Sequence, residues 1–168
     1  MSVLTVLSMI SLATGTVQDL PESVVLKTLV RYDKSALEKF GGQSSEFEVW
    51  IEKVKAKVQP VMQKLDVRVD FEIENIEFFD ARIPYGETSK ESWEYLQQYH
   101  NSKKEKKFVS YFCDGCFGGG WGNRGVPCYE PSNGVKQFHA MNLNGGLGGV
   151  EYAAAIWIHE LGHSIGMT

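Results

Sequence analysis

The sequence predicts an α/β fold, with helices packed on a twisted mixed β-sheet, and three patterns support this prediction. The segment Ser23–Tyr32 is rich in valine and leucine, which favours a strand. Val67–Glu74 alternates apolar and charged residues, as a strand with one buried face does. Between these segments, apolar residues recur at the spacing of a helix. Strands that alternate with amphipathic helices build layered α/β domains, and 168 residues suffice for one such core.

The first helix is expected to begin at Ser45, which forms a capping box with Glu48. Pro60 should kink this helix near its end, because proline removes a backbone hydrogen bond from the helix interior. The residues of its apolar face fall at 3.6-residue spacing and are Phe47, Trp50, Ile51, Val54, Val58, Val61, Met62 and Leu65.

Further elements follow in the second half of the chain. Thr88 and Glu91 should start a second helix, whose buried edge is formed by Trp93, Leu96 and Tyr99. Strands are expected at Lys107–Phe112 and at Gly134–Asn142. A glycine-rich hinge at residues 144–149 then leads into a last helix, which is apolar almost all round and should therefore be buried.

The glycine-rich stretch after the 107–112 strand is expected to be a long surface loop. Gly120, Gly122 and Gly125 have the spacing of a dinucleotide-binding fingerprint. That interpretation is rejected, because the third glycine must open a helix that holds the pyrophosphate, and Pro127 follows instead.

Three cysteines occur, Cys113 and Cys116 in "CDGC" and Cys128 further on. A zinc ribbon would need a second ligand pair, and a thioredoxin-like motif would need the pair to open a helix. Structural disulfides are therefore favoured, with the odd cysteine paired outside this sequence.

Residues 1–15 resemble a secretory signal peptide, since they are uncharged and apolar from Val3 to Leu12, with Ala13 and Gly15 placed as at a cleavage site. A trimmed start or a leftover pro-segment is the alternative, because the segment lacks a positive start. A signal would make the protein secreted and extracellular. The net charge of -4 argues against nucleic-acid binding, and no apolar run is long enough to span a bilayer.

The strongest functional signal is "HELGH" in the last helix. His159 and His163 lie four residues apart, so both imidazoles project from one side of a helix and suit a zinc ion. Glu160 lies about 100° around the helix, where it can take a proton from a zinc-activated water but is poorly aimed to ligate. We therefore expect peptide-bond hydrolysis, with Glu160 as general base and the two histidines as metal ligands. Histidines satisfied only by solvent or backbone are the alternative.

Extended to the end of the chain, "HELGHSIGMT" resembles the long zinc signature of the metzincins, H-E-x-x-H-x-x-G-x-x-H. Together with Val24–Asp33 and "GVPCYEPSNGVKQFHAMN", it is similar to the adamalysin/reprolysin (ADAM-like) family. The resemblance implies that residues 22–168 are a catalytic domain, comprising the upper subdomain and the active-site helix. It implies that Gly166 turns the chain and that a third histidine occupies position 169. The chain as printed is thus expected to be a C-terminally truncated piece that binds zinc weakly and cleaves little.

The resemblance also implies protein or peptide substrates, which pair with an exposed sheet edge. By position this edge would be the strand up to Asn142, with Val135, Gln137 and His139 as contacts, although an ordinary edge strand is the alternative. A secreted zinc endopeptidase is the leading hypothesis. A catalytically inactive metzincin-like binding module is the second. A thermolysin-like zincin with a distant glutamate ligand fits less well, because Gly166 would then have no task.

Overall fold

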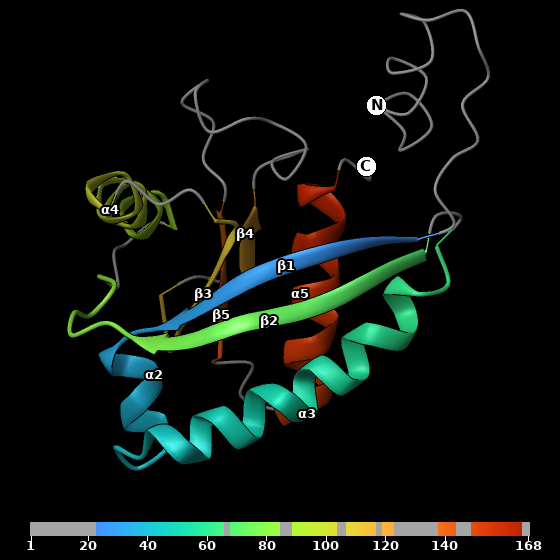
Figure 1. The fold of residues 1–168 in the computed structure, drawn as a ribbon. Coiled ribbons are helices and arrows are strands. Elements are labelled where there is room, and N and C mark those ends of the chain that lie inside the picture. Colours follow the sequence, from blue (N-terminus) through green and yellow to red (C-terminus); the bar gives the residue numbers. More distant parts are fainter. Residues whose placement is uncertain are drawn as a thin grey trace, which may run out of the picture.

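A computed structural model gives the fold of the chain (Figure 1) and describes residues 23–65, 68–84, 89–103, 107–116, 119–122, 138–143 and 149–165. In chain order the elements are β1 (Ser23–Tyr32), α2 (Lys34–Lys39), α3 (Ser44–Met62), β2 (Arg68–Phe78), α4 (Ser89–Ser102), β3 (Val109–Cys113), β4 (Gly120–Gly122), β5 (Phe138–Asn142) and α5 (Gly149–Ser164). Several predicted features lie outside the described residues, namely the leader at residues 1–15, Cys128, Val135, Gln137 and Gly166.

Five strands form one mixed sheet in the order β2-β1-β3-β5-β4. β1 pairs in parallel with β2 and β3, and β3 pairs in parallel with β5. β4 alone runs antiparallel, alongside β5. Figure 1 shows the two long strands β1 and β2 crossing the short strands at a marked angle, so the sheet is twisted. The predicted α/β class, a mixed sheet with packed helices, is confirmed.

Helices pack on both faces of this sheet. α3 and α5 share one apolar cluster with β1, β2, β3 and β5, and α4 belongs to a second cluster on the opposite face. Trp157 of α5 lies within the first cluster, fully buried. Its ring meets Phe71 of β2 and Phe112 of β3 nearly at right angles, with centroids 5.0 and 5.1 Å apart. These edge-on contacts fix α5 against the middle of the sheet.

The two strongest strand predictions are confirmed. β1 has the predicted bounds, and in β2 the side chains of Val69 and Phe71 are buried while Arg68 and Glu72 are exposed. β2 runs further than predicted, to Phe78, and its register against β1 shifts by one residue between Thr28 and Leu29, after which pairing continues to the end of both strands. Such a bulge bends the strand and increases its local twist.

The predicted capping box at Ser45 is wrong. α3 begins at Ser44, with Gln43 as the N-cap residue and without a side-chain capping bond. The expected apolar face is buried at Phe47, Ile51, Val54, Val58 and Met62, but Val61 is 42% exposed. Pro60 lies inside α3 near its end, as expected.

The short helix α2 was not predicted. Asp33 caps it, because its side chain accepts a hydrogen bond of 2.9 Å from the backbone N–H of Ala36. The other carboxylate oxygen of Asp33 accepts a 2.8 Å bond from the N–H of Ile83. This buried carboxylate therefore joins the end of β1 to the segment after β2. Six residues are too few to show helical periodicity in a sequence.

The prediction that the strand ending at Asn142 is an exposed edge is also wrong. β5 lies between β3 and β4, and all of its residues are buried. Among the described strands, the edge beside it is β4, within the glycine-rich stretch that was predicted to be a loop. Glycine has low strand propensity, so the composition of this stretch does not favour a strand. Backbone bonds maintain it, including one of 2.8 Å from the N–H of Asn142 to the carbonyl of Gly119.

The expectation that α5 is buried all round holds for one side only. Ala153, Trp157 and Leu161 are buried, whereas Tyr152 is 39% exposed. In the part of the chain that the structure describes, no helix is both long and apolar enough to cross a membrane.

Candidate metal centre

The spacing of residues along α5 determines which side chains of "HELGH" face the core. Trp157, Glu160, Leu161 and Ser164 are buried and recur at intervals of three and four residues, which places them on one stripe of the helix. His159 is exposed and lies on the flank of this stripe. The motif therefore divides into a buried acid and a pair of imidazoles beside it.

The two histidines approach each other through the Nε2 atom of each ring. The Nε2 atoms of His159 and His163 are 3.0 Å apart, and the rings lie at 80° to each other with centroids 4.4 Å apart. Two nitrogens that bind zinc tetrahedrally, each at about 2.0–2.1 Å, are about 3.3–3.4 Å apart. An increase of roughly 0.3 Å in the distance between the two Nε2 atoms would thus suffice to admit the ion. The pair therefore fits zinc.

The described residues supply no further ligand beside this pair. Within the described residues, no group of three histidine, cysteine, aspartate or glutamate side chains is placed to hold a metal ion. Gly166 and the end of the predicted zinc signature lie outside the described residues. The ligand roles of His159 and His163 accordingly stay a prediction, for which the geometry is suitable.

Glu160 is only 3% exposed, which is unusual for a carboxylate. Its Oε2 atom is buried and has no hydrogen-bond partner among the described residues. Burial without a partner disfavours the charged form, and raises the pKa of Glu160 from 4.5 to about 7. A carboxyl group with such a pKa can both accept and release a proton near neutral pH, as acid–base catalysis requires.

His139, predicted to contact substrate, is instead buried completely under α5. Its Nε2 atom lies 2.6 Å from Ser110 Oγ and accepts a 3.1 Å bond from the Trp157 indole N–H. Its Nδ1 atom lies 3.3 Å from Ser164 Oγ. Burial lowers the pKa of His139 to about 3, so the ring is neutral. This side chain joins β3, β5 and α5 and is not accessible to a substrate.

The same polar network holds the backbone of α5. Ser164 Oγ donates a 2.8 Å hydrogen bond to the carbonyl of Glu160, one turn back. Ser110 lies 2.8 Å from Thr28, which extends the network to β1. Sequence reasoning missed Ser110 and Ser164 in this role, since small polar residues in apolar segments carry no distinctive pattern.

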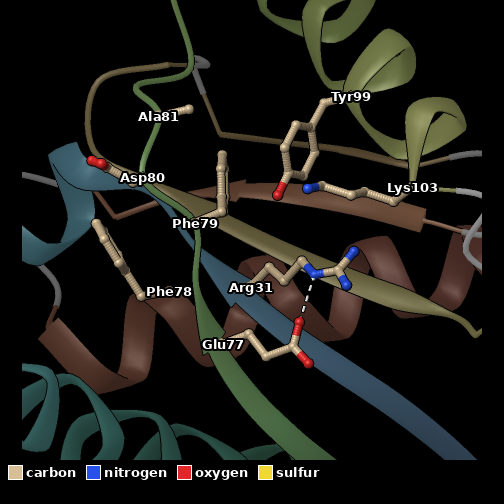
Figure 2. Close-up of a pocket in the computed structure, with 8 residues that line it drawn as sticks. All are labelled: Arg31, Glu77, Phe78, Phe79, Asp80, Ala81, Tyr99 and Lys103. Atoms are coloured by element: carbon tan, nitrogen blue, oxygen red, sulfur yellow. Dashed lines mark hydrogen bonds and ion pairs between the residues drawn. The ribbon is translucent and has the colours of Figure 1, made fainter.

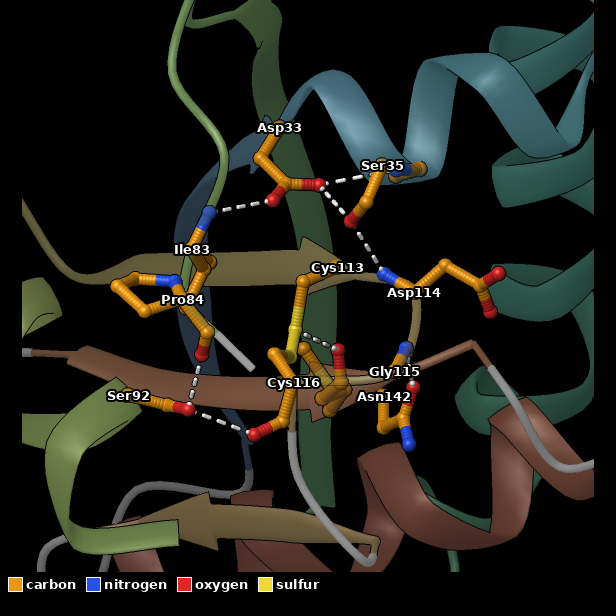
Figure 3. The surroundings of a disulfide bond; sticks show 12 residues. Asp33, Ser35, Ile83, Pro84, Ser92, Cys113, Asp114, Gly115, Cys116 and Asn142 are labelled. Atoms are coloured by element: carbon orange, nitrogen blue, oxygen red, sulfur yellow. Dashed lines mark hydrogen bonds between the residues drawn. A yellow bond between two sulfur atoms is a disulfide. The ribbon is translucent and has the colours of Figure 1, made fainter. Parts of the chain in front are cut away.

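Figure 3 shows that Cys113 and Cys116 form a disulfide at the end of β3. The turn that it closes is held by two more contacts: the N–H of Asp114 donates to Ser35 Oγ and that of Gly115 to Asn142 Oδ1, each at 2.8 Å. The predicted presence of a disulfide is confirmed for this pair. The closed turn fixes where the chain leaves β3.

A pocket of about 450 Å³ lies elsewhere, at the ends of β1 and β2 (Figure 2). The Arg31 guanidinium within it donates a 3.0 Å hydrogen bond to Glu77, and Tyr99 and Lys103 line another part of its wall. None of its lining residues belongs to α5 or β4. The Arg31–Glu77 pair thus occupies one side of this pocket, away from the two histidines of α5.

A mixed sheet that carries "HExxH" on a buried helix defines an α/β domain of the metallopeptidase type. A model of the reprolysin type, described as metallo-peptidase family M12, matches residues 23–168, and the chain belongs to this family. A search of curated proteins finds no match.

Solved structures provide two further comparisons. A protein in a "Structure of a chaperone-substrate complex" has a TM-score of 0.59 and 18% identity, over 86% of this chain and 24% of that one. At this identity the likeness concerns the fold alone. Metalloproteinase-II from Bacteroides fragilis has a TM-score of 0.47 and 14% identity, over 89% of this chain and 44% of that one. The chain thus spans less than half the length of either protein.

Proposed function

We propose that this chain carries the metal-binding core of a zinc-dependent endopeptidase that hydrolyses peptide bonds of proteins. Membership in metallo-peptidase family M12 supports zinc-dependent proteolysis in general. The observation that carries the specific proposal is the convergence of two imidazole nitrogens, 3.0 Å apart, next to a buried and unpartnered glutamate. Burying a carboxylate without a hydrogen-bond partner costs free energy of folding. A helix with a purely structural role would gain nothing from such a group.

His159 and His163 would hold the zinc ion through their Nε2 atoms. When bound, zinc supplies Lewis acidity, which makes a water acidic near neutral pH and polarises the scissile carbonyl. Glu160 would accept the proton of the attacking water at a carboxylate oxygen and then deliver it to the departing amine nitrogen. Both transfers need Glu160 to keep one position, which the hydrogen bond to its backbone carbonyl from Ser164 favours.

The substrate backbone would pair with the free edge of the sheet. Among the described strands, β4 is the edge next to β5, and α5 packs against both. An extended peptide added beside β4 would pass close to the metal centre, as β-augmentation allows. This proposal takes β4 as the substrate edge in place of the strand that holds His139, which is buried, while Val135 and Gln137 lie outside the described residues. We further propose that the protein is secreted, which the disulfide between Cys113 and Cys116 supports.

The proposal is tested by zinc binding and by proteolysis with one substitution. Isothermal titration of the metal-free protein should show zinc binding that His159→Ala and His163→Ala each abolish. Cleavage of denatured casein is measured with a zinc-loaded chain extended through position 169 and the Met-turn, and it should fall about 100-fold or more in Glu160→Ala, with zinc affinity retained. Zinc binding without any cleavage by the extended parent would instead support the binding-module alternative. Equal cleavage by the parent and Glu160→Ala would refute the role of Glu160.

A further inference from the structure

The Glu160 side chain lies against the two glycines of β4. If a Cβ atom were added at Gly120, it would lie 2.5 Å from Oε1, 2.6 Å from Cγ and 2.8 Å from Cδ of Glu160. A Cβ at Gly122 would lie 2.8 Å from Oε2 and 3.3 Å from the carbonyl oxygen of Glu160. Real Cβ atoms essentially never approach other heavy atoms more closely than 3.0 Å. Any other residue at these two positions would therefore displace the carboxylate.

The alternation of β4 explains why both contacts involve glycine. Successive side chains of a strand point to opposite faces, so positions 120 and 122 face α5 and position 121 faces α4. Trp121 stacks on Trp93 of α4, with ring centroids 5.3 Å apart and planes at 12°. The tryptophan thus fixes β4 from one side of the sheet, while the glycines leave room on the other.

We propose that Gly120 and Gly122 are positioning residues, which keep open a slot between β4 and α5 that holds the Glu160 carboxylate ready beside the metal centre. The slot is shielded from bulk solvent, since Glu160 is only 3% exposed. Glycines also bring no side-chain donor that could form a hydrogen bond with Oε2 of Glu160. None of the glycines at 119, 120 and 122 has a left-handed φ, so backbone conformation does not account for them. The inference rests on the proposed function in that Glu160 is the base that needs positioning.

Gly119 provides a matched control. It immediately precedes β4, and a Cβ there would meet no atom of the described residues within 4 Å. Gly119→Ala and Gly120→Ala therefore change the same chemical group in neighbouring positions, with equal effects on the unfolded chain. Only the second substitution meets Glu160.

The first test is a crystal structure of each metal-free variant. In Gly120→Ala we expect the Glu160 carboxylate to be displaced by about 1 Å or more, and in Gly119→Ala to stay in place. A Gly120→Ala structure with the carboxylate in its parent position would overturn the proposal. Should Gly120→Ala not fold, the double variant Gly120→Ala/Glu160→Ala should fold, since the clashing atoms are gone. Failure of the double variant as well would show that Glu160 is not what the glycine accommodates.

The second test uses denatured casein and the zinc-loaded chain extended through position 169 and the Met-turn. Because a misplacement of about 1 Å can cost 100-fold in rate, Gly120→Ala should lower kcat by roughly that factor with KM nearly unchanged. Gly119→Ala should stay within about twofold of the parent. In a Glu160→Ala background, Gly120→Ala should have no further effect, because groups that act as a unit are not additive. If Glu160→Ala itself cleaves like the parent, the proposed function fails, while the carboxylate displacement still decides the role of Gly120.

Discussion

Replacing His139 by glutamine should flatten the pH dependence of folding stability. Burial lowers the pKa of this imidazole from 6.5 to about 3 in the folded chain. The unfolded chain therefore binds a proton below pH 6.5 that the folded chain excludes. Stability contributed by the neutral ring is fully present above pH 6.5 and is lost progressively as the pH falls toward 3.

The magnitude follows from linkage. At pH 5 the unfolded imidazole is 1.5 pH units below its pKa of 6.5, and the folded one is still neutral. At about 1.36 kcal/mol per unit, His139 alone should lower the free energy of unfolding by about 2 kcal/mol between pH 8 and pH 5. Glu160 and Asp33 have raised pKa values and titrate in the opposite sense, so acidification relieves them. Comparing parent and variant cancels these shared contributions.

Urea unfolding followed by tryptophan fluorescence measures the effect at pH 8, 6.5 and 5. His139→Gln should be less stable than the parent at pH 8, because it loses bonds to Ser110 and Trp157. Its stability should then fall about 2 kcal/mol less on acidification to pH 5. Ser110→Ala is the control, since it removes one partner but keeps the imidazole and its pH dependence. Parallel pH curves for the parent and His139→Gln would refute the reasoning.

Three further predictions use the same unfolding assay. Ile51→Ala should cost about 2–5 kcal/mol, because Ile51 is fully buried, whereas Val49→Ala, at a position 53% exposed, should change stability by less than about 0.5 kcal/mol. Asp33→Ala should cost at least about 2 kcal/mol, since it removes the α2 cap and leaves the N–H of Ile83 without an acceptor; a loss below 0.5 kcal/mol would contradict this. Glu160→Gln should stabilise the metal-free chain by about 3 kcal/mol at pH 8 and by less than about 0.5 kcal/mol at pH 4.5. The reason is that a carboxyl group with a pKa near 7 destabilises the fold only when it is ionised. Equal stability of parent and variant at pH 8 would count against that pKa.

The local elements could be predicted because their patterns are local. Alternation in β2 and the valine-rich run of β1 reflect burial of one or both strand faces, and the structure confirms both. The longer helices could be predicted, but the start of α3 could not, since the N-cap depends on backbone geometry at Gln43. Asp33, which caps α2, is also held by a hydrogen bond from the N–H of Ile83, fifty residues away in the chain. A short helix stabilised by a distant residue leaves little trace in its own sequence.

The candidate site divides in the same way. The spacing within "HELGH" is enough to place the two imidazoles together, because the helix itself brings them within 3.0 Å. The contact between β4 and Glu160 could not be predicted, since it is the pairing of β4 with β5 that brings β4 against α5. One signal was present: glycines at 120 and 122 flank a tryptophan, which is the period-two pattern of a strand with one empty face.

The placement of the acid also explains how the core and the metal centre share one helix. Glu160 lies three residues after Trp157 and four before Ser164, so it belongs to the stripe that packs on the sheet. The histidines lie one position before it and three after it, which turns both toward the flank of that stripe. A helix rotated to expose Glu160 would also withdraw Trp157 from Phe71 and Phe112. Core packing therefore opposes rotation of α5, and the carboxylate keeps its place because the tryptophan does.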